Sequence, residues 1–280
     1  DWSVADFVRG SMGLDVKDSV LERGVATVPT NVSAEIIDLI RAKARVIQAG
    51  ALTIPIEGPS NLCRIDGEPT VHQHTEGQED ISESIPSLSP VEVNPKGLVA
   101  LIPLSMELVS DSPNLDAALN IAIAGAFAGK LDTLALATLL ADANIPDSVA
   151  GQATNTWAGI MAGVGSMMGL DMDVPTALIC NPADYISRAG ELSDTGGNWL
   201  GAPPILANML DLPTTTMTAG YALLGDFAKG VGVAVRQELR LEVVRWAKSK
   251  TASHLLVSHA RMQAYTLQPN ARYRQLATVV

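Results

Sequence analysis

The sequence predicts an α+β fold built around one long, buried helix, and three observations predict it. Residues 98–104 have the composition of a buried strand. Ser112 followed by Pro113 has the pattern of a helix N-terminus, and apolar residues then recur at helical spacing to about residue 140. Residues 51–93 are instead rich in glycine, proline, serine and acids, so they predict a long polar excursion from the core.

The helix predicted over about residues 113–140 is apolar on nearly all sides. Its large residues recur at helical spacing, and small residues lie between them: Leu119, Ile123, Phe127, Leu131 and Leu134, with Ala118, Ala122, Ala126 and Gly129. Such a helix must be covered by protein. The uncharged run 117–129 is shorter than the roughly 20 apolar residues that a bilayer needs, and Lys130 and Asp132 end it. No membrane span is therefore expected.

Shorter elements are predicted before this helix. Residues 1–32 alternate short polar and apolar pieces and fit an extended arm. A helix is expected from about Ser33, a good N-cap, to Gln48, and strand-like residues follow at 51–56. Ser105 can cap a brief helical turn ahead of the long helix.

After the long helix, the pattern predicts a helix at 157–168 and a buried strand at 176–180. Asn181 and Pro182 then have the pattern of an N-cap and first helical position, with the helix body reaching about residue 192. Residues 223–237 and 239–244 alternate as strands do.

The composition favours a protein that buries surface against copies of itself. Hydrophobic residues make up 47% of the 280 residues, while charged residues make up only 18% and aromatic residues 4%. So few charges are unusual on the surface of a soluble monomer, although an alanine-rich globular protein is the alternative. Cys63 and Cys180 have no zinc-site or thioredoxin-like spacing, which indicates synthesis in a reducing cytoplasm.

Five sequence blocks occur in the order found in the major capsid proteins of tailed bacteriophages, which share the Hong Kong 97 fold. The blocks are KGLVALIPLSMELVSDS, ALICNPADYISRAGEL, WLGAPPILANM, LLGDFAKGVGVAVRQELRLEVV and ARMQAYTLQPNARYRQL. The chain therefore resembles that family over about residues 91–276, and residues 1–90 add little to the resemblance. No single block is highly specific, and the resemblance rests on all five blocks occurring in register.

The resemblance implies a division of the chain. Residues 1–32 would form an N-terminal arm, and residues 51–93 a two-stranded extended loop that reaches over a neighbouring subunit. Residues 151–232 would form the axial domain, which clusters around five-fold and six-fold axes. The rest would form the peripheral domain with its spine helix at about 113–140, and it comprises residues 33–50, 94–150 and 233–280.

The resemblance also implies function and partners. Pentamers and hexamers of this chain would close into an icosahedral shell around double-stranded DNA, without sequence-specific binding and without a membrane. Assembly would take place in the host bacterial cytoplasm, with a portal protein and in some members a scaffold, a maturation protease and a decoration protein. The first residue, Asp1, fits a mature form from which an upstream segment was removed, although renumbering would look the same.

Two features of charge bear on this expectation. The net charge of −11 suits a wall that faces packed DNA without binding its phosphates. Some family members join a lysine of the extended loop covalently to a neighbour, but residues 51–93 contain no lysine. That crosslink is therefore not expected here, and noncovalent contacts or a decoration protein would have to stabilise the shell.

The charges are also divided between two segments. Residues 57–92 contain eight acids and the single base Arg64, whereas residues 236–274 contain eight bases and two acids. We expect the acidic loop to lie on the basic segment of a neighbour, although two ordinary solvated faces are the alternative. The residues predicted at this subunit interface are Arg64, Glu68, Glu79, Asp80 and Glu83 in the loop, and Arg240, Arg245 and Arg261 on the receiving face.

Trp199 and Pro203 are predicted to shape contacts near the symmetry axis, with core packing or turn formation as the alternative. The sequence contains no recognisable catalytic, cofactor or nucleotide motif. Gly125 to Leu131 is one residue short of a phosphate loop.

His72, His74 and Glu76 would share one face of a strand, and a metal-dependent soluble enzyme is the least favoured alternative. Polar loop residues explain this cluster better, because structural zinc needs four ligands. The nearest alternative to a virus is an encapsulin-like compartment, which encloses a cargo enzyme with the same fold.

Overall fold

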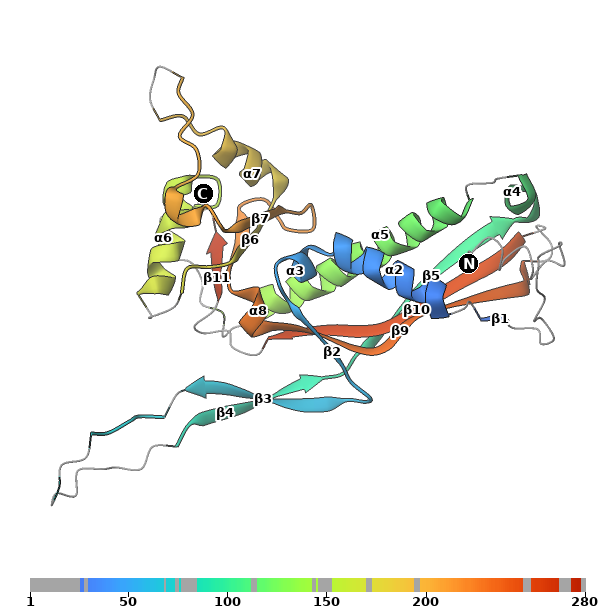
Figure 1. Ribbon diagram of the computed structural model, residues 1–280, viewed down its shortest axis with the longest axis horizontal. Helices are drawn as coiled ribbons and strands as arrows, with labels where there is room; N and C mark the ends of the chain where they lie inside the picture. Colours follow the sequence, from blue (N-terminus) through green and yellow to red (C-terminus); the bar gives the residue numbers. More distant parts are fainter. Residues whose placement is uncertain are drawn as a thin grey trace.

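The computed structural model describes residues 26–27, 30–67, 69–73, 76, 85–111, 115–142, 145, 153–169, 173–193, 197–248, 253–266 and 273–277. The molecule is elongated. Figure 1 shows one long body of sheet and helices, a second body at one end of it, and a two-stranded hairpin that projects away from both.

The long body contains a five-stranded sheet. Strands β9 (Val231–Lys248), β10 (Ser253–Thr266) and β5 (Lys96–Ser105) are antiparallel neighbours in that order. Strand β1 (Ala26–Thr27) pairs with β9 antiparallel, and β2 (Leu52–Pro55) pairs with β9 in parallel. Leu256, Ser258, Ala260 and Met262 of β10 are buried, while Val257, His259 and Arg261 between them are half-exposed, so this sheet has one covered face.

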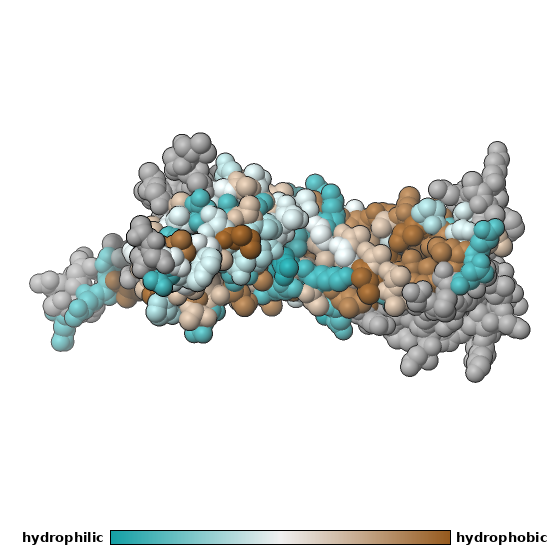
Figure 2. Space-filling model, turned by 90° about the horizontal axis from the view of Figure 1, so that it is seen from above, coloured by the Kyte–Doolittle hydropathy of each residue, from teal (hydrophilic) through white to brown (hydrophobic). Residues whose placement is uncertain are grey.

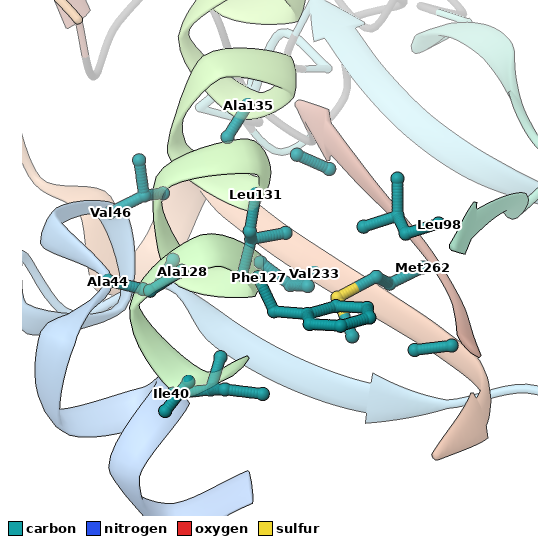
Figure 3. Close-up of a cluster of buried hydrophobic side chains, with 14 of the residues drawn as sticks. Ile40, Ala44, Val46, Leu98, Phe127, Ala128, Leu131, Ala135, Val233 and Met262 are labelled. Carbon is teal, nitrogen blue, oxygen red and sulfur yellow. The ribbon is translucent and has the colours of Figure 1, made fainter. Parts of the chain in front are cut away.

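Helix α5 (Leu115–Ala141) crosses the covered face of this sheet with α2 (Thr30–Lys43) and α3 (Arg45–Gln48) beside it (Figure 1). In Figure 3, Phe127 and Leu131 of α5 lie against Leu98, Val233 and Met262 of the sheet. Full burial of each such large side chain stabilises the fold by about 1.5–3 kcal/mol. The predicted long helix is therefore present, and the brief helix α4 (Met106–Asp111) precedes it as expected.

By length and composition, residues Ala117–Ala141 could also cross a membrane. Half of that apolar window is buried inside the subunit, however, and the buried side includes the carboxylate of Asp132. These contacts identify α5 as the core helix of the long body.

The single helix predicted from about Ser33 to Gln48 is two helices, broken at Ala44. Ala44 has extended backbone angles. The break exposes the N–H groups of Arg45 and Val46, which donate to the Asp132 carboxylate at 2.9 and 3.1 Å. A side chain 87 positions away thus caps α3, which local pattern could not predict.

The second body contains a four-stranded sheet in the order β11 (Tyr273–Ala277), β8 (Tyr221–Gly225), β6 (Ala177–Cys180), β7 (Leu210–Pro213). Helix α6 (Trp157–Met168) packs Ile160, Val164 and Met167 against Leu178 and Leu224 of this sheet. Helix α7 (Pro182–Ala189) starts at the predicted cap Asn181, whose side chain accepts the Ala183 N–H, and it ends three residues before residue 192.

Two details of this second body differ from the expectation. The strand pattern over residues 223–237 is interrupted by the short helix α8 (Phe227–Gly230), which Asp226 caps and which carries the chain from β8 to β9. Strand β11 pairs antiparallel with β8, although residues 233–280 were expected together in the peripheral domain. Pairing between distant segments is decided by tertiary packing, which local pattern does not contain.

The predicted extended loop contains a hairpin of β3 (Ser60–Gly67) and β4 (Ser87–Val93), paired antiparallel. Figure 1 shows this hairpin leaving the long body below β2. At its base, Val93 is buried with Ala234 and Tyr265 of the five-stranded sheet.

Candidate functional site

The described residues contain no group of three or more His, Cys, Asp or Glu side chains that could hold a metal ion. His72 and Glu76 are exposed in the hairpin region, and His74 lies outside the described residues. The described part of the chain also exposes large apolar side chains at several separate surfaces.

The first surface is the extended hairpin. Val71 is 92% exposed and Ile85 is 90% exposed, so these side chains make almost no contact within the subunit. Glu68, Glu79, Asp80 and Glu83 lie outside the described residues, and their interface role stays a prediction. Exposed apolar residues on a two-stranded arm are typical of a segment that is covered by a partner.

Arg64 is the one predicted hairpin residue that the structure describes in full. Its Nη1 lies 3.8 Å from Oδ2 of Asp142, and the two side chains are only 12% and 13% exposed. This ion pair lies within the subunit. The structure therefore gives Arg64 an internal partner that the sequence did not suggest.

The second surface is the face of the five-stranded sheet opposite α5. The β10–β5 register places Val257 beside Leu101 and His259 beside Val99. Val99 and Leu101 are 62% and 59% exposed. This surface, which we call the outer sheet face, therefore has an apolar part.

The same surface holds two of the three predicted receiving residues. Arg240 is exposed and lies across from His259, and Arg261 lies two positions further along β10 on the same face. The Arg240 Nε is 2.9 Å from Glu242 Oε1, which partly neutralises it. The backbone of Arg245 belongs to β9, but its side chain lies outside the described residues. The sheet thus brings Arg240 and Arg261 together although they are far apart in sequence.

The third surface lies at the end of the second body, on α7 and the segment that follows it. Trp199 is 70% exposed, Ile186 66% and Leu192 50%. Leu192 and Trp199 form an antiparallel bridge, and the Leu200 N–H donates to the Glu191 carbonyl at 2.9 Å. These contacts therefore tie Trp199 and Leu200 to residues 191 and 192.

Pro203 is half-buried and directly precedes the short helix η1 (Pro204–Leu206), so it also helps to form a turn. Gly197 and Gly201 flank Trp199 with φ of +84° and +71°. These backbone angles strain other residues, which explains the glycines beside the exposed tryptophan. The location of this surface near a symmetry axis stays a prediction.

A buried cluster around Arg188 supports this third surface from inside, and sequence reasoning missed it. The Arg188 guanidinium is fully buried, forms a close ion pair with Asp211 and donates to the Thr154 carbonyl at 2.8 Å. It also lies 5.1 Å from the centroid of the Trp157 ring. Burial alone would lower the pKa of Arg188, but the Asp211 carboxylate raises it above its ordinary value.

Cys180 is part of the same cluster. Burial, followed by the charge of Asp211, raises the pKa of the Cys180 thiol to about 12. A thiol with so high a pKa is rarely ionised near neutral pH and is therefore a weak nucleophile. A basic residue at a helix position that should be apolar, such as position 188, is the only signal of this cluster in the sequence.

The exposed side of α5 is also apolar. Ile121 is 56% exposed, and Ala118, Ala122, Ala126 and Gly129 lie on the exposed side with it. Figure 2 shows a brown region over this part of the long body. The small side chains would allow another backbone to approach closely.

A spine helix on a five-stranded sheet, a second four-stranded body and a projecting hairpin together define a capsid-type fold. The model of the phage capsid family matches residues 24–138, which include the hairpin and nearly all of α5. No curated protein matches the chain at a significant level.

Solved structures are similar to this chain over most or all of its length. The capsid of an empty GTA particle has a TM-score of 0.67 and 15% sequence identity, covering 98% of this chain and 98% of that chain. Mycobacterium phage Adephagia gives a TM-score of 0.63 at 15% identity, covering 100% of this chain and 99% of that chain. A virus-like particle from Pyrococcus furiosus gives a TM-score of 0.62 at 11% identity, covering 87% of this chain and 96% of that chain. The chain thus has the Hong Kong 97 fold, and its predicted resemblance to tailed-phage capsid proteins is confirmed.

Proposed function

We propose that this protein is the major capsid protein of a tailed bacteriophage and that it assembles as pentamers and hexamers into an icosahedral shell around double-stranded DNA. The observation that carries the proposal is the capsid fold over nearly the whole chain, at TM-scores of 0.62 to 0.67. The protein acts in the virion after assembly in the host bacterial cytoplasm, and it works by association rather than by catalysis.

The exposed surfaces support this proposal. Apolar side chains such as Val71, Leu101 and Trp199 are more than half exposed at three separate places on the subunit. Contacts at several surfaces of each copy allow weak individual interfaces to close a stable container, because every added subunit is held by more than one neighbour.

We propose that the hairpin of one subunit binds the outer sheet face of a neighbouring subunit. The hairpin region carries acids and exposed apolar residues, and the outer sheet face carries Arg240 and Arg261 beside exposed Val99 and Leu101. Apolar contact would supply most of the free energy of binding, while the opposite charges would select the orientation. The turn with Trp199 and Pro203 would meet its copies around the axes of pentamers and hexamers.

The negative net charge supports the proposed content of the shell. A wall of net charge −11 that does not bind phosphates lets DNA move during filling. A portal protein would provide the entry point for DNA. A scaffold, a maturation protease and a decoration protein are further partners that the family resemblance suggests for this chain.

Electron microscopy of the purified protein after size-exclusion chromatography tests the proposal. Closed shells of uniform diameter with nucleic acid inside are the expected result. Shells that hold a protein cargo would mean an encapsulin-like compartment. A chain that stays a small oligomer across salt and concentration, with any upstream segment restored, would overturn the capsid function.

A further inference from the structure

The base of the extended hairpin is fixed to the five-stranded sheet. The Tyr265 ring of β10 lies directly over Gly232 of β9, where an added Cβ would come within 2.2 Å of the ring. Val93, the last residue of β4, is fully buried in the same cluster. The Asn94 N–H also donates to Gln263 Oε1 at 2.7 Å. These contacts form a first anchor at the point where the hairpin leaves the sheet.

A second contact lies further out along the hairpin. Arg64 of β3 reaches Asp142, the residue after the end of α5, with 3.8 Å between Nη1 and Oδ2. The hydroxyl of Thr266, in β10, donates to the same carboxylate oxygen at 2.5 Å. Asp142 thus joins the hairpin, the end of the spine helix and the end of a central strand.

The position of Asp142 is electrostatically unfavourable without a nearby cation. The C-terminal end of a helix carries partial negative charge, and the last turn of α5 contains no basic residue. The carboxylate is also mostly shielded from water, at 13% exposure. The Arg64 guanidinium brings a positive charge to this carboxylate, and that charge comes from the hairpin rather than from the helix.

We propose that Arg64 and Asp142 are positioning residues, which fix the direction of the extended hairpin before the subunit assembles. This inference rests on the proposed function. Ser60 and Arg64 are about 13 Å apart along β3 at the usual strand rise of ~3.3 Å per residue. A single anchor at the base would act as a pivot, whereas two separated anchors set a direction.

The direction matters because the hairpin amplifies any rotation. The described turn at Glu76 follows Arg64 by about 12 residues, which span roughly 40 Å when extended. A small rotation at Arg64 would therefore move the end of the hairpin away from its partner surface. A hairpin that is already directed loses less conformational freedom when a neighbour binds it.

Hydrogen exchange of the full chain, kept unassembled at low concentration, tests this role. Arg64→Gln should speed amide exchange in β3 and β4 by about tenfold, which corresponds to ~1.4 kcal/mol, and leave β6 and β8 unchanged. Arg41→Gln is the matched control, because Arg41 also pairs with an aspartate, Asp38, but on the exposed surface. It should leave exchange in the hairpin unchanged.

A double variant that exchanges the two charges of the Arg64–Asp142 ion pair separates loss of this contact from destabilisation of the whole subunit. Arg64→Asp alone should speed exchange in β3 and β4, and adding Asp142→Arg should slow it again, because the attraction is restored. The proposal would be overturned if amide exchange in the hairpin were equally fast in Arg64→Gln and Arg41→Gln. It would also be overturned if exchange in the double variant Arg64→Asp with Asp142→Arg were as fast as in Arg64→Asp alone. If Arg64→Gln speeds exchange in every strand, the double variant alone decides. Because exchange is measured on the unassembled subunit, it is independent of whether the wild type forms shells.

Discussion

Asp132 is a buried carboxylate in the middle of α5, and it holds the start of α3. Its side chain is almost fully buried, at 4% exposure, and it accepts hydrogen bonds from the N–H groups of Arg45 and Val46. Burial raises the pKa of Asp132 above its ordinary value, and the two hydrogen bonds lower it only in part. The carboxylate therefore fixes the angle between two helices at an electrostatic cost.

This cost predicts a particular pH dependence of stability. Because the pKa of Asp132 is higher in the folded than in the unfolded chain, the folded state binds the proton more tightly. The stability that Asp132 contributes is greatest in acid and falls as the pH rises from about 3.8 through the raised folded value. Asp132→Asn should remove this contribution to the pH dependence of stability. The unfolding free energy of the wild type minus that of the variant should therefore fall as the pH rises.

Urea unfolding of the unassembled subunit at a series of pH values measures this difference. Asp38→Asn is the matched control, because the Asp38 side chain is 76% exposed. A wild-type advantage over Asp132→Asn that grew with pH would contradict the expected sign. Above the raised pKa, where Asp132 is a carboxylate, the substitution should still cost about 1–3 kcal/mol, since an amide offers only one acceptor atom to two N–H donors.

At the scale of the element, two glycines in helices should respond in opposite ways to alanine. A Cβ added at Gly129 of α5 meets nothing within 4 Å, whereas one at Gly159 of α6 would lie 2.1 Å from the Ala153 carbonyl oxygen. We expect Gly129→Ala to stabilise the unassembled subunit by about 0.5–1 kcal/mol through helix propensity, and Gly159→Ala to destabilise it. Urea unfolding checks both changes, and a loss of stability in Gly129→Ala would mean that its side of α5 is packed within the subunit.

The elements that the sequence predicted well are those whose signals are local. Helix α6 has the predicted bounds, because its cap Thr156 and its apolar period lie next to each other in the chain. The cap Asn181 similarly identified the start of α7. The break at Ala44 and the helix α8 were missed. The break depends on distant Asp132, and α8 is only four residues long, too short for a periodic pattern.

At the scale of the whole molecule, the order of the sequence blocks predicted the fold, but it did not predict the contacts that hold the parts together. The buried cluster of Arg188 and Asp211 and the anchor of Arg64 and Asp142 each join residues from separate elements. Such pairs have no fixed spacing in sequence. The outer sheet face could be predicted only in part, because sequence charge points to Arg240 and Arg261, whereas the β9–β10 register that places them on one face is a tertiary feature.

The pairing of the acidic hairpin with the outer sheet face predicts a defect in assembly on charge reversal. Replacing Glu79, Asp80 and Glu83 by lysine should lower the yield of shells at low salt, because these side chains would then meet Arg240 and Arg261 with like charge. Each exposed pair is worth only about 0–1 kcal/mol, but every copy in the shell would lose it. Light scattering during assembly across a salt series measures the effect, which should shrink as salt screens the charges.

Two further variants make this prediction specific to the proposed contact. Replacing Asp38, Glu107 and Asp111 by lysine changes the net charge equally at exposed positions outside the hairpin and should affect assembly less. Adding Arg240→Glu and Arg261→Glu to the hairpin variant should restore yield, since opposite charges would again face each other across the interface. A hairpin variant that assembles like the wild type at every salt concentration would mean that these charges face solvent in the shell, and the apolar residues Val71 and Ile85 alone would then have to direct the hairpin to its neighbour.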